Sequence, residues 1–260
     1  MGGRLILKLC VLASGSSGNA IYLESPHIKL LIDAGLSGRE LNERLRGLGL
    51  GLAKIGAVLI SHEHSDHLQG AGALGRRYRI PLYLNAGTHR QTGEKLKGVK
   101  EIRHFTTGQA FPLEDLWIEP FSVPHDAADP VGFNFYQGDR KLSVALDLGY
   151  PTRLIRERMK GAQLIVLESN HDVEMLMKGP YPWPLKQRIL GKMGHLSNRD
   201  SSSFLADLLH AELSHVVLAH LSQTNNRPEL ARDSALATLQ GQGAALHVAR
   251  QDTPTEMIAF

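Results

Sequence analysis

Three histidines and an aspartate follow an apolar run within six positions of this chain. The run Val58–Ile60 is typical of a strand buried on both faces, and the segment from Ser61 to His67 reads Ser-His-Glu-His-Ser-Asp-His. Loops that leave the ends of such strands often carry chemistry. Imidazole nitrogen and carboxylate oxygen suit zinc and related divalent ions. Ligands packed this closely are more easily shared by two adjacent ions than gathered around one. The sequence therefore predicts a metal site, and the alternative is a polar loop whose histidines lie at the surface.

The composition is that of an ordinary globular protein. The chain has 260 residues, of which 42% are hydrophobic and 21% charged, enough for one large two-layer domain over residues 1–260. No apolar run approaches the roughly 20 residues of a membrane span, and Met1–Lys8 is a poor signal peptide because Lys8 interrupts its apolar part. The single cysteine, Cys10, excludes internal disulfides. We therefore expect a cytoplasmic protein with no membrane partner.

Hydrophobic periodicity predicts strands and helices throughout the chain. The expected strands, besides the one at Val58–Ser61, are Leu5–Leu12, Ile21–Glu24, Lys29–Ile32, Pro81–Leu84, Val99–Phe105, Leu116–Phe121, Gly132–Tyr136, Leu142–Leu146, Gln163–Leu167, His215–Ala219, Ala245–Ala249 and Glu256–Phe260. The expected helices are Ser37–Leu48, Leu68–Arg79, Thr88–Leu96, one starting at Pro151, one capped by Asn198 or Asp200, and Pro228–Gln240. Three more potential ligands, His125, Asp147 and His220, each directly follow a strand-like run.

The motif His62-x-His64-x-Asp66-His67 resembles the signature of the metallo-β-lactamase superfamily of metallohydrolases, and the later ligands follow in the family's order. The resemblance implies an α/β (α+β) protein, a single-domain αββα sandwich with a two-metal site along one edge. The ions would be two divalent metals per chain, Zn²⁺ or Mn²⁺. By the resemblance, one is held by His62, His64 and His125, the other by Asp66, His67 and His220, and Asp147 bridges the two.

Glu168 ends a predicted strand, and His195 directly precedes a predicted helix. This pair resembles the phosphodiesterase branch of the superfamily, which includes RNase Z. There, a histidine oriented by such a glutamate helps the leaving group depart. A carboxylate raises the pKa of a neighbouring imidazole and makes it a better general acid near neutral pH. The alternative is that His195 only starts a helix and that Glu168 is a solvated strand end.

Three segments, Ala13–Ala20, Glu168–Asp172 and Ala219–Asn226, narrow the resemblance to the small YycJ/WalJ (VicX) group, which is related to RNase J-type enzymes. This implies a dinuclear-metal phosphodiesterase that activates a bridging water and acts as a 5′-to-3′ DNA exonuclease, with DNA rather than RNA as its nucleic-acid substrate. Only 48 positions separate Asp147 from His195, too few for the β-CASP domain of the RNase J type.

Several polar residues are candidates for the remaining roles. Asp66 is expected to assist as a base while it holds its ion. The candidates for binding the phosphate groups or the nucleotide ends of the substrate are Ser14, Ser16, Asn19, His171, Ser197, Asn198, Ser222, Asn225 and Asn226. Residues 151–192 carry eight Lys or Arg against four acids, with Tyr181 and Trp183 among them. Phosphate attraction and base stacking would use such a surface, and a solvated helix face is the alternative.

Two other functions are compatible with the sequence. The same metal site could hydrolyse a small ester, thioester, lactone or cyclic phosphodiester, because the site chemistry is shared across the superfamily. A non-catalytic nucleic-acid-binding module with a vestigial site is less favoured, since a vestigial site is expected to have lost at least one ligand. The sequence leaves open the choices between zinc and manganese, between DNA and RNA, and between exonuclease and endonuclease, as well as the oligomeric state.

Overall fold

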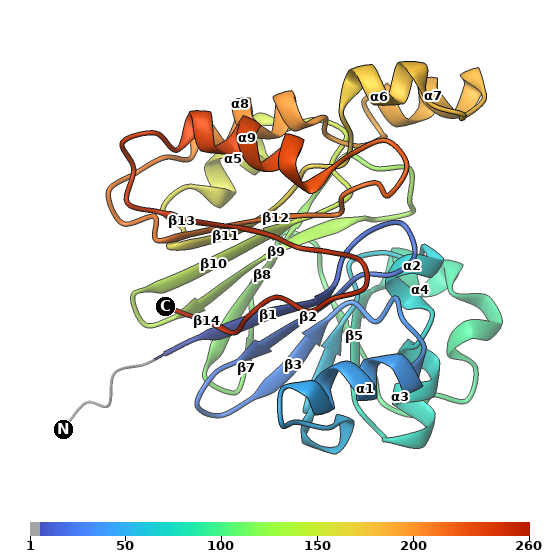
Figure 1. Ribbon diagram of the computed structural model, residues 1–260. Helices are drawn as coiled ribbons and strands as arrows, with labels where there is room; N and C mark the ends of the chain where they lie inside the picture. Colours follow the sequence, from blue (N-terminus) through green and yellow to red (C-terminus); the bar gives the residue numbers. More distant parts are fainter. Residues whose placement is uncertain (1–5) are drawn as a thin grey trace.

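The computed structural model describes residues 6–260, so Leu5 and most of the Met1–Lys8 segment lie outside the described residues. Two seven-stranded sheets stack face to face in this part of the chain, and helices cover both outer faces (Figure 1). Both sheets contribute to one apolar core between them. The predicted single-domain αββα sandwich is therefore confirmed. Within residues 6–260, no helix is both long and apolar enough to cross a membrane.

The first sheet has the strand order β14-β1-β2-β3-β4-β5-β6. Its strands are β1 (Lys8–Ala13), β2 (Ala20–Glu24), β3 (Lys29–Ile32), β4 (Ala57–Leu59), β5 (Leu82–Asn85), β6 (Ile102–Phe105) and β14 (Ile258–Ala259). The pairs from β14 to β3 are antiparallel, and those from β3 to β6 are parallel. The carboxyl ends of the parallel strands therefore lie along one edge.

The second sheet has the order β13-β12-β11-β10-β9-β8-β7. Its strands are β7 (Phe111–Leu113), β8 (Leu116–Ser122), β9 (Val131–Gln137), β10 (Arg140–Ala145), β11 (Leu164–Glu168), β12 (His215–Ala219) and β13 (Ala245–Val248). The pairs from β7 to β10 are antiparallel, and those from β10 to β13 are parallel. Each sheet thus joins an antiparallel half to a parallel half.

Two groups of helices flank the sheets (Figure 1). The first sheet is accompanied by α1 (Gly38–Gly47), α2 (Ser65–Leu68), α3 (Ala71–Arg77), α4 (Ala86–Gln91) and the short 3₁₀ helices η1 (Leu52–Lys54) and η2 (Gly93–Leu96). The second is accompanied by α5 (Arg153–Met159), α6 (Val173–Lys178), α7 (Trp183–Leu190), α8 (Asn198–Asp207) and α9 (Pro228–Thr238). In Figure 1, α6 and α7 extend beyond the other helices of their layer.

Apolar side chains fill three layers. Phe133 and Phe135 lie between the sheets, Leu41 of α1 lies between the first sheet and its helices, and Phe204 of α8 lies on the outer face of the second sheet. Burying such side chains is the main force that holds sheets and helices together. Helix α1 follows its sequence pattern closely, because Ser37 caps it in a capping box, as its predicted start requires.

The structure corrects the predicted helix Leu68–Arg79: Leu68 is the last residue of α2, and the helix that follows, α3, begins at Ala71 after Gln69 and Gly70. A Cβ at Gly70 would lie 2.2 Å from the carbonyl oxygen of Leu36. The chain must therefore have glycine where it passes this backbone. The predicted helix Thr88–Leu96 is likewise divided, since Gly93 has a positive φ of 51°.

Helix starts in the second half also differ from the prediction. Pro151 lies outside α5, which Thr152 caps, and Ser197 rather than Asn198 or Asp200 caps α8 by accepting a hydrogen bond from the Asp200 amide. Strand β7 and helices α6 and α7 were not predicted. The short segments β7 and α6 have three and six residues, too few for a clear periodic signal.

Candidate metal centre

Strand ends bring the seven predicted ligands together. The loop after β4 and the start of α2 carry four of them, and the loops after β8, β10 and β12 carry one each. Subsets of these residues place their ligand atoms within 4.8 Å of one another. The subsets are His62, His64 and His125; His62, His67 and Asp147; and Asp66, His67 and His220. The side chains thus reach one place from the carboxyl ends of β4, β10 and β12 and of β8, which runs in the same direction as β10 because both pair antiparallel with β9.

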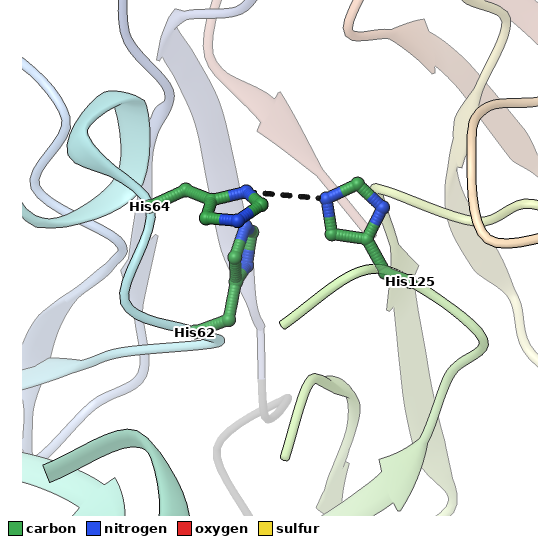
Figure 2. Close-up of side chains that lie close together, drawn as sticks. All are labelled: His62, His64 and His125. Atoms are coloured by element: carbon green, nitrogen blue, oxygen red, sulfur yellow. Dashed lines mark hydrogen bonds between the residues drawn. The ribbon is translucent and has the colours of Figure 1, made fainter. Parts of the chain in front are cut away.

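His62, His64 and His125 form the first cluster (Figure 2). His62 and His64 come from one loop, and His125 reaches toward them from the opposite sheet, with its Nε2 3.3 Å from Nδ1 of His64. The His62 and His64 rings are 4.7 Å apart between centroids. Three imidazoles from two sheets therefore face one small volume.

The second cluster consists of Asp66, His67 and His220, and Asp147 lies against it. Its Oδ2 is 2.7 Å from Nε2 of His67, and its Oδ1 is 3.1 Å from Nδ1 of His220. The same Oδ1 is 3.7 Å from Nε2 of His125, a member of the first cluster. Asp66 completes the arrangement, with Oδ2 3.4 Å from Nε2 of His67. The Asp147 carboxylate is thus the group that touches both clusters.

Three non-glycine residues at the site have left-handed backbone conformations. Asp33, Asp147 and His220 have φ values of 61°, 52° and 55°. Such conformations cost about 1–3 kcal/mol each and are kept where the surrounding structure requires them. Each of these residues follows the end of a strand. The strain is therefore concentrated at the turns that carry the polar side chains of the site.

The donor atoms at the site fit a divalent metal. His62 Nε2, Asp147 Oδ2 and His220 Nδ1 are buried, and within residues 6–260 none has a hydrogen-bond partner of suitable geometry. A buried polar atom without a partner costs about 1–3 kcal/mol. Imidazole nitrogens and carboxylate oxygens that converge in this way are the ligands that zinc and similar ions prefer. Coordination would satisfy these atoms.

The carboxylates make the site favourable for positive charge. Burial lowers the pKa of His220, but Asp147 and Glu168 outweigh it and raise the pKa to about 10. Burial likewise lowers the pKa of His67, and Asp147 with Asp33 raises it well above its usual value. Burial raises the pKa of Asp147, and His220 and His67 lower it well below its usual range. The cluster therefore holds cations, either protons on imidazole or metal ions.

Asp33 is a functional residue that the sequence analysis missed. Its Oδ2 accepts a hydrogen bond of 2.7 Å from Nδ1 of His67, and the Ser61 amide and hydroxyl donate to the same carboxylate at 2.8 and 2.9 Å. With Nδ1 engaged, Nε2 of His67 points toward Asp147. Carboxylates that hold ligand histidines in this way orient the ring and increase its basicity. The available signal was an aspartate at the end of β3, the neighbour of β4.

Glu168 and His195 are in contact, as the resemblance implies. Glu168 Oε1 is 2.8 Å from Nδ1 of His195, and Oε2 accepts hydrogen bonds from the amides of Leu148 and Leu196 at 2.9 and 3.0 Å. Glu168 is fully buried, so it is not a solvated strand end. Burial raises its pKa, but His195 and His220 lower it to about 2. Burial lowers the pKa of His195, and Glu168 reverses this and raises it.

Only two of the predicted substrate-binding residues, Ser16 and Ser222, line the cavity in front of the clusters. Ser14 and Asn19 are buried behind it. The Ser14 hydroxyl accepts from the His220 amide at 2.6 Å, and Asn19 Nδ2 lies 3.1 Å from Nε2 of His67. These two side chains therefore hold the proposed ligands in place and are not offered to the cavity.

The other predicted substrate-binding residues are buried, and three of them are held by side-chain hydrogen bonds. Ser197 caps α8, and Asn198 exchanges hydrogen bonds with Asn226 at 2.8 and 2.9 Å. His171 and Asn225 are almost fully buried as well, and within residues 6–260 their side-chain polar atoms have no hydrogen-bond partner. None of these five residues is among those that line the cavity. The structure thus places them where they connect the loops after β11 and β12.

The cavity has a volume of about 260 Å³. One side of it consists of residues that the sequence analysis did not assign to the site, namely Tyr181, Leu185, Arg188 and Ile189. Asn170 also lines it and donates to the His220 carbonyl at 2.9 Å. Helix α7 and the residue two positions before it therefore close one side of the site.

The strand topology and the clusters define a metal-dependent hydrolase. Residues 29–221 match the family described as the beta-lactamase superfamily domain. The match covers more than half of the chain, and the chain belongs to this superfamily, the metallo-β-lactamases.

The chain is similar to the exodeoxyribonuclease YycJ of Bacillus anthracis, with 41% identity over 91% of this chain and 90% of the relative. It is similar to the exodeoxyribonuclease WalJ of Streptococcus pneumoniae, with 41% identity over 86% and 85%. The crystal structure of the metallo-β-lactamase fold protein YhfI from Bacillus subtilis superposes with a TM-score of 0.74 at 17% identity, covering 96% of this chain and 99% of that one. This last likeness confirms the fold.

Replacing Asp33 tests its role at His67. We expect Asp33→Asn to lower the affinity for zinc by about 10- to 100-fold, because the charged acceptor of the His67 Nδ1 proton is lost. Competition with a chromogenic chelator measures this affinity. The matched control is Asp233→Asn on the exposed face of α9, which should bind zinc like the unchanged protein. Equal affinity of both variants would remove Asp33 from the site.

The raised imidazole pKa values predict proton release on metal binding. When no ion is bound, the raised pKa values of His67 and His220 favour the protonated form of both imidazoles near pH 7. Ligation requires neutral imidazole, so zinc binding at pH 7 should release protons. The release should decline as the pH approaches 10, where His220 is already losing its proton. Calorimetry in buffers of different ionisation enthalpy measures the number released, and zinc binding without proton release at pH 7 contradicts the prediction.

Proposed function

We propose that this chain is a two-metal phosphodiesterase that acts on DNA as a 5′-to-3′ exonuclease in the cytoplasm, with residues 1–260 forming one hydrolase domain. The observation that carries the proposal is the convergence of seven metal-type ligands beside the Glu168–His195 pair. The similarity to relatives named exodeoxyribonuclease over about nine tenths of the chain supports DNA as the substrate. The single cysteine, Cys10, is free and buried, which supports the cytoplasm.

The proposal assigns two ions, zinc or manganese, to the clusters. His62, His64 and His125 would hold one, Asp66, His67 and His220 the other, and Asp147 would contact both. When bound, two such ions lower the pKa of a water and neutralise charge on the scissile phosphate. The carboxylate of Asp147 supports the shared position, because it lies within 3.7 Å of a nitrogen from each set.

Proton transfers are assigned to the residues around the clusters. Asp66 is partly exposed to the cavity and would accept a proton from the attacking water. His195 engages Glu168 through Nδ1, which leaves Nε2 to give a proton to the leaving oxygen. Glu168 stays ionised and stabilises the imidazolium form of His195. The acid and the base thus belong to different loops that face the same cavity.

A nuclease assay with restored metal tests the proposed function. Protein stripped of metal is reloaded separately with zinc or manganese and given 5′-labelled single- and double-stranded DNA and RNA, bis-p-nitrophenyl phosphate and a lactone panel. We expect metal-dependent release of short products from the 5′ end of DNA, and none from His64→Ala, which should keep its fold. Turnover of an ester or lactone without any cleavage of nucleic acid would instead favour a small-molecule hydrolase.

The leaving-group role of His195 gives a separate prediction. His195→Ala should slow DNA cleavage by about 10²- to 10⁴-fold, because the leaving oxygen no longer receives a proton. Hydrolysis of bis-p-nitrophenyl phosphate should fall much less, since its leaving group departs without protonation. Metal content, measured by inductively coupled plasma mass spectrometry, should not change. Loss of metal from this variant would make His195 a ligand, and equal losses on both substrates would exclude the acid role.

A further inference from the structure

We propose that helix α7 forms a nucleotide-binding wall of the active site. In this assignment, Arg188 contacts a phosphate of a single-stranded DNA end, and Tyr181 with Leu185 and Ile189 packs against the base next to the scissile phosphate. The inference rests on the proposed nuclease function and adds the residues that bind its substrate. We call these four residues the α7 wall.

The spacing of the α7 wall along the helix gives it one face. Leu185, Arg188 and Ile189 are three and four positions apart, and residues at these separations lie side by side on a helix. All three line the cavity, and so does Tyr181, two positions before the helix begins. The face combines an aromatic ring, two aliphatic side chains and a guanidinium group. This combination suits a nucleotide, which has an apolar face and a charged phosphate.

Arg188 brings a permanently charged guanidinium group to the cavity. It is the only Lys or Arg among the residues lining the cavity, which otherwise include the acids Asp66, Asp126 and Asp147. Its Nε donates to Asp126 Oδ2 at 2.6 Å. Among residues 6–260, no acceptor is bonded to its other donors, and its side chain is 60% exposed. Asp126 therefore fixes the guanidinium at the cavity while the remaining N–H groups stay available for a phosphate.

The α7 wall is fixed relative to the proposed acid. The His195 amide donates to the Ile189 carbonyl at 3.0 Å. Lys186 is buried, and its Nζ donates to the Met177 carbonyl of α6 at 2.7 Å, which ties the two helices together. A Cβ at Gly194 would lie 2.2 Å from the Ile189 carbonyl oxygen, so the helix end and the His195 loop are in close contact. A base packed on the wall would thus be held in register with His195.

Other basic residues of the 151–192 stretch are already paired. Arg156, Arg158, Lys160 and Lys178 form ion pairs with Asp207, Glu119, Glu157 and Glu174, respectively. These four lie on or next to α5 and α6 and do not line the cavity. Half of the eight basic residues of this stretch are therefore paired with acids, as in a solvated helix face. Arg188 is the member placed to meet a substrate.

The test compares Arg188→Ala and Tyr181→Ala with Arg39→Ala in the metal-loaded protein. Arg39 is a matched control, an exposed arginine that is paired with Glu43 on α1. The substrates are single-stranded DNA, the same strand without bases on its two 5′-terminal nucleotides, and bis-p-nitrophenyl phosphate. Binding of a hydrolysis-resistant phosphorothioate strand is followed by fluorescence anisotropy over a range of salt concentrations.

Arg188→Ala should raise KM for DNA at least about 10-fold, and the slope of log Kd against log salt should fall by about 0.7, the value for one phosphate contact to a single strand.

Tyr181→Ala should raise KM about 10-fold for the normal strand and leave KM for the baseless strand unchanged. Neither variant should affect bis-p-nitrophenyl phosphate, and Arg39→Ala should match the unchanged protein on every substrate.

Two distinguishable results would overturn the whole inference, and a third would remove the base packing from it. If the unchanged protein cleaves DNA but Arg188→Ala keeps its Kd and salt slope, the α7 wall is wrong while the nuclease function stands. If the unchanged protein hydrolyses bis-p-nitrophenyl phosphate but no DNA, the proposed function fails and the α7 wall fails with it. An equal KM increase for normal and baseless strands in Tyr181→Ala would exclude base packing.

Discussion

The buried Asp147 carboxylate is the charge on which the rest of this site depends. It is 3% exposed at its side chain, and an uncompensated charge at such a position would be very costly. His67 and His220 face its two oxygens, so positive charge must always accompany it, as protons or as metal ions. The strained conformations of Asp33, Asp147 and His220 are consistent with this demand, because the gain from pairing these groups can exceed the cost of a few positive φ angles.

The sandwich supplies this arrangement with ligands from both sheets. Each sheet has a parallel half, and the carboxyl ends of those strands lie along one edge of the molecule. Loops at such edges can carry polar side chains, while the strands behind them remain apolar and buried. The hydrogen bonds of Asp33 and Glu168 then orient the histidines. A close backbone approach supports the turns, since a Cβ at Gly35 would lie 1.7 Å from the Asp66 carbonyl oxygen.

The sequence was sufficient to predict the fold. It was also sufficient to indicate all seven proposed ligands, because each of these residues lies in the segment that follows a strong apolar strand signal. Through the resemblance it was also sufficient to predict the contact between Glu168 and His195, and their roles in catalysis stay predictions. It was not sufficient for Asp33, whose importance depends on the pairing of β3 with β4 and is not visible in local pattern. Asn19 and Asn198 were expected to contact substrate, but polar loop residues look alike in sequence whether they face a cavity or a buried network. Leu185, Arg188 and Ile189 of α7 were not among the predicted site residues, because a short helix with one proline inside it and another directly before it has weak periodicity.

A crystal structure of the zinc-loaded protein, with anomalous diffraction recorded above and below the zinc edge, would show directly whether the chain binds two ions. We expect two anomalous peaks per chain, one among His62, His64 and His125 and one among Asp66, His67 and His220, with Asp147 contacting both. A single peak, or a peak held by other residues, would contradict the proposed two-metal centre.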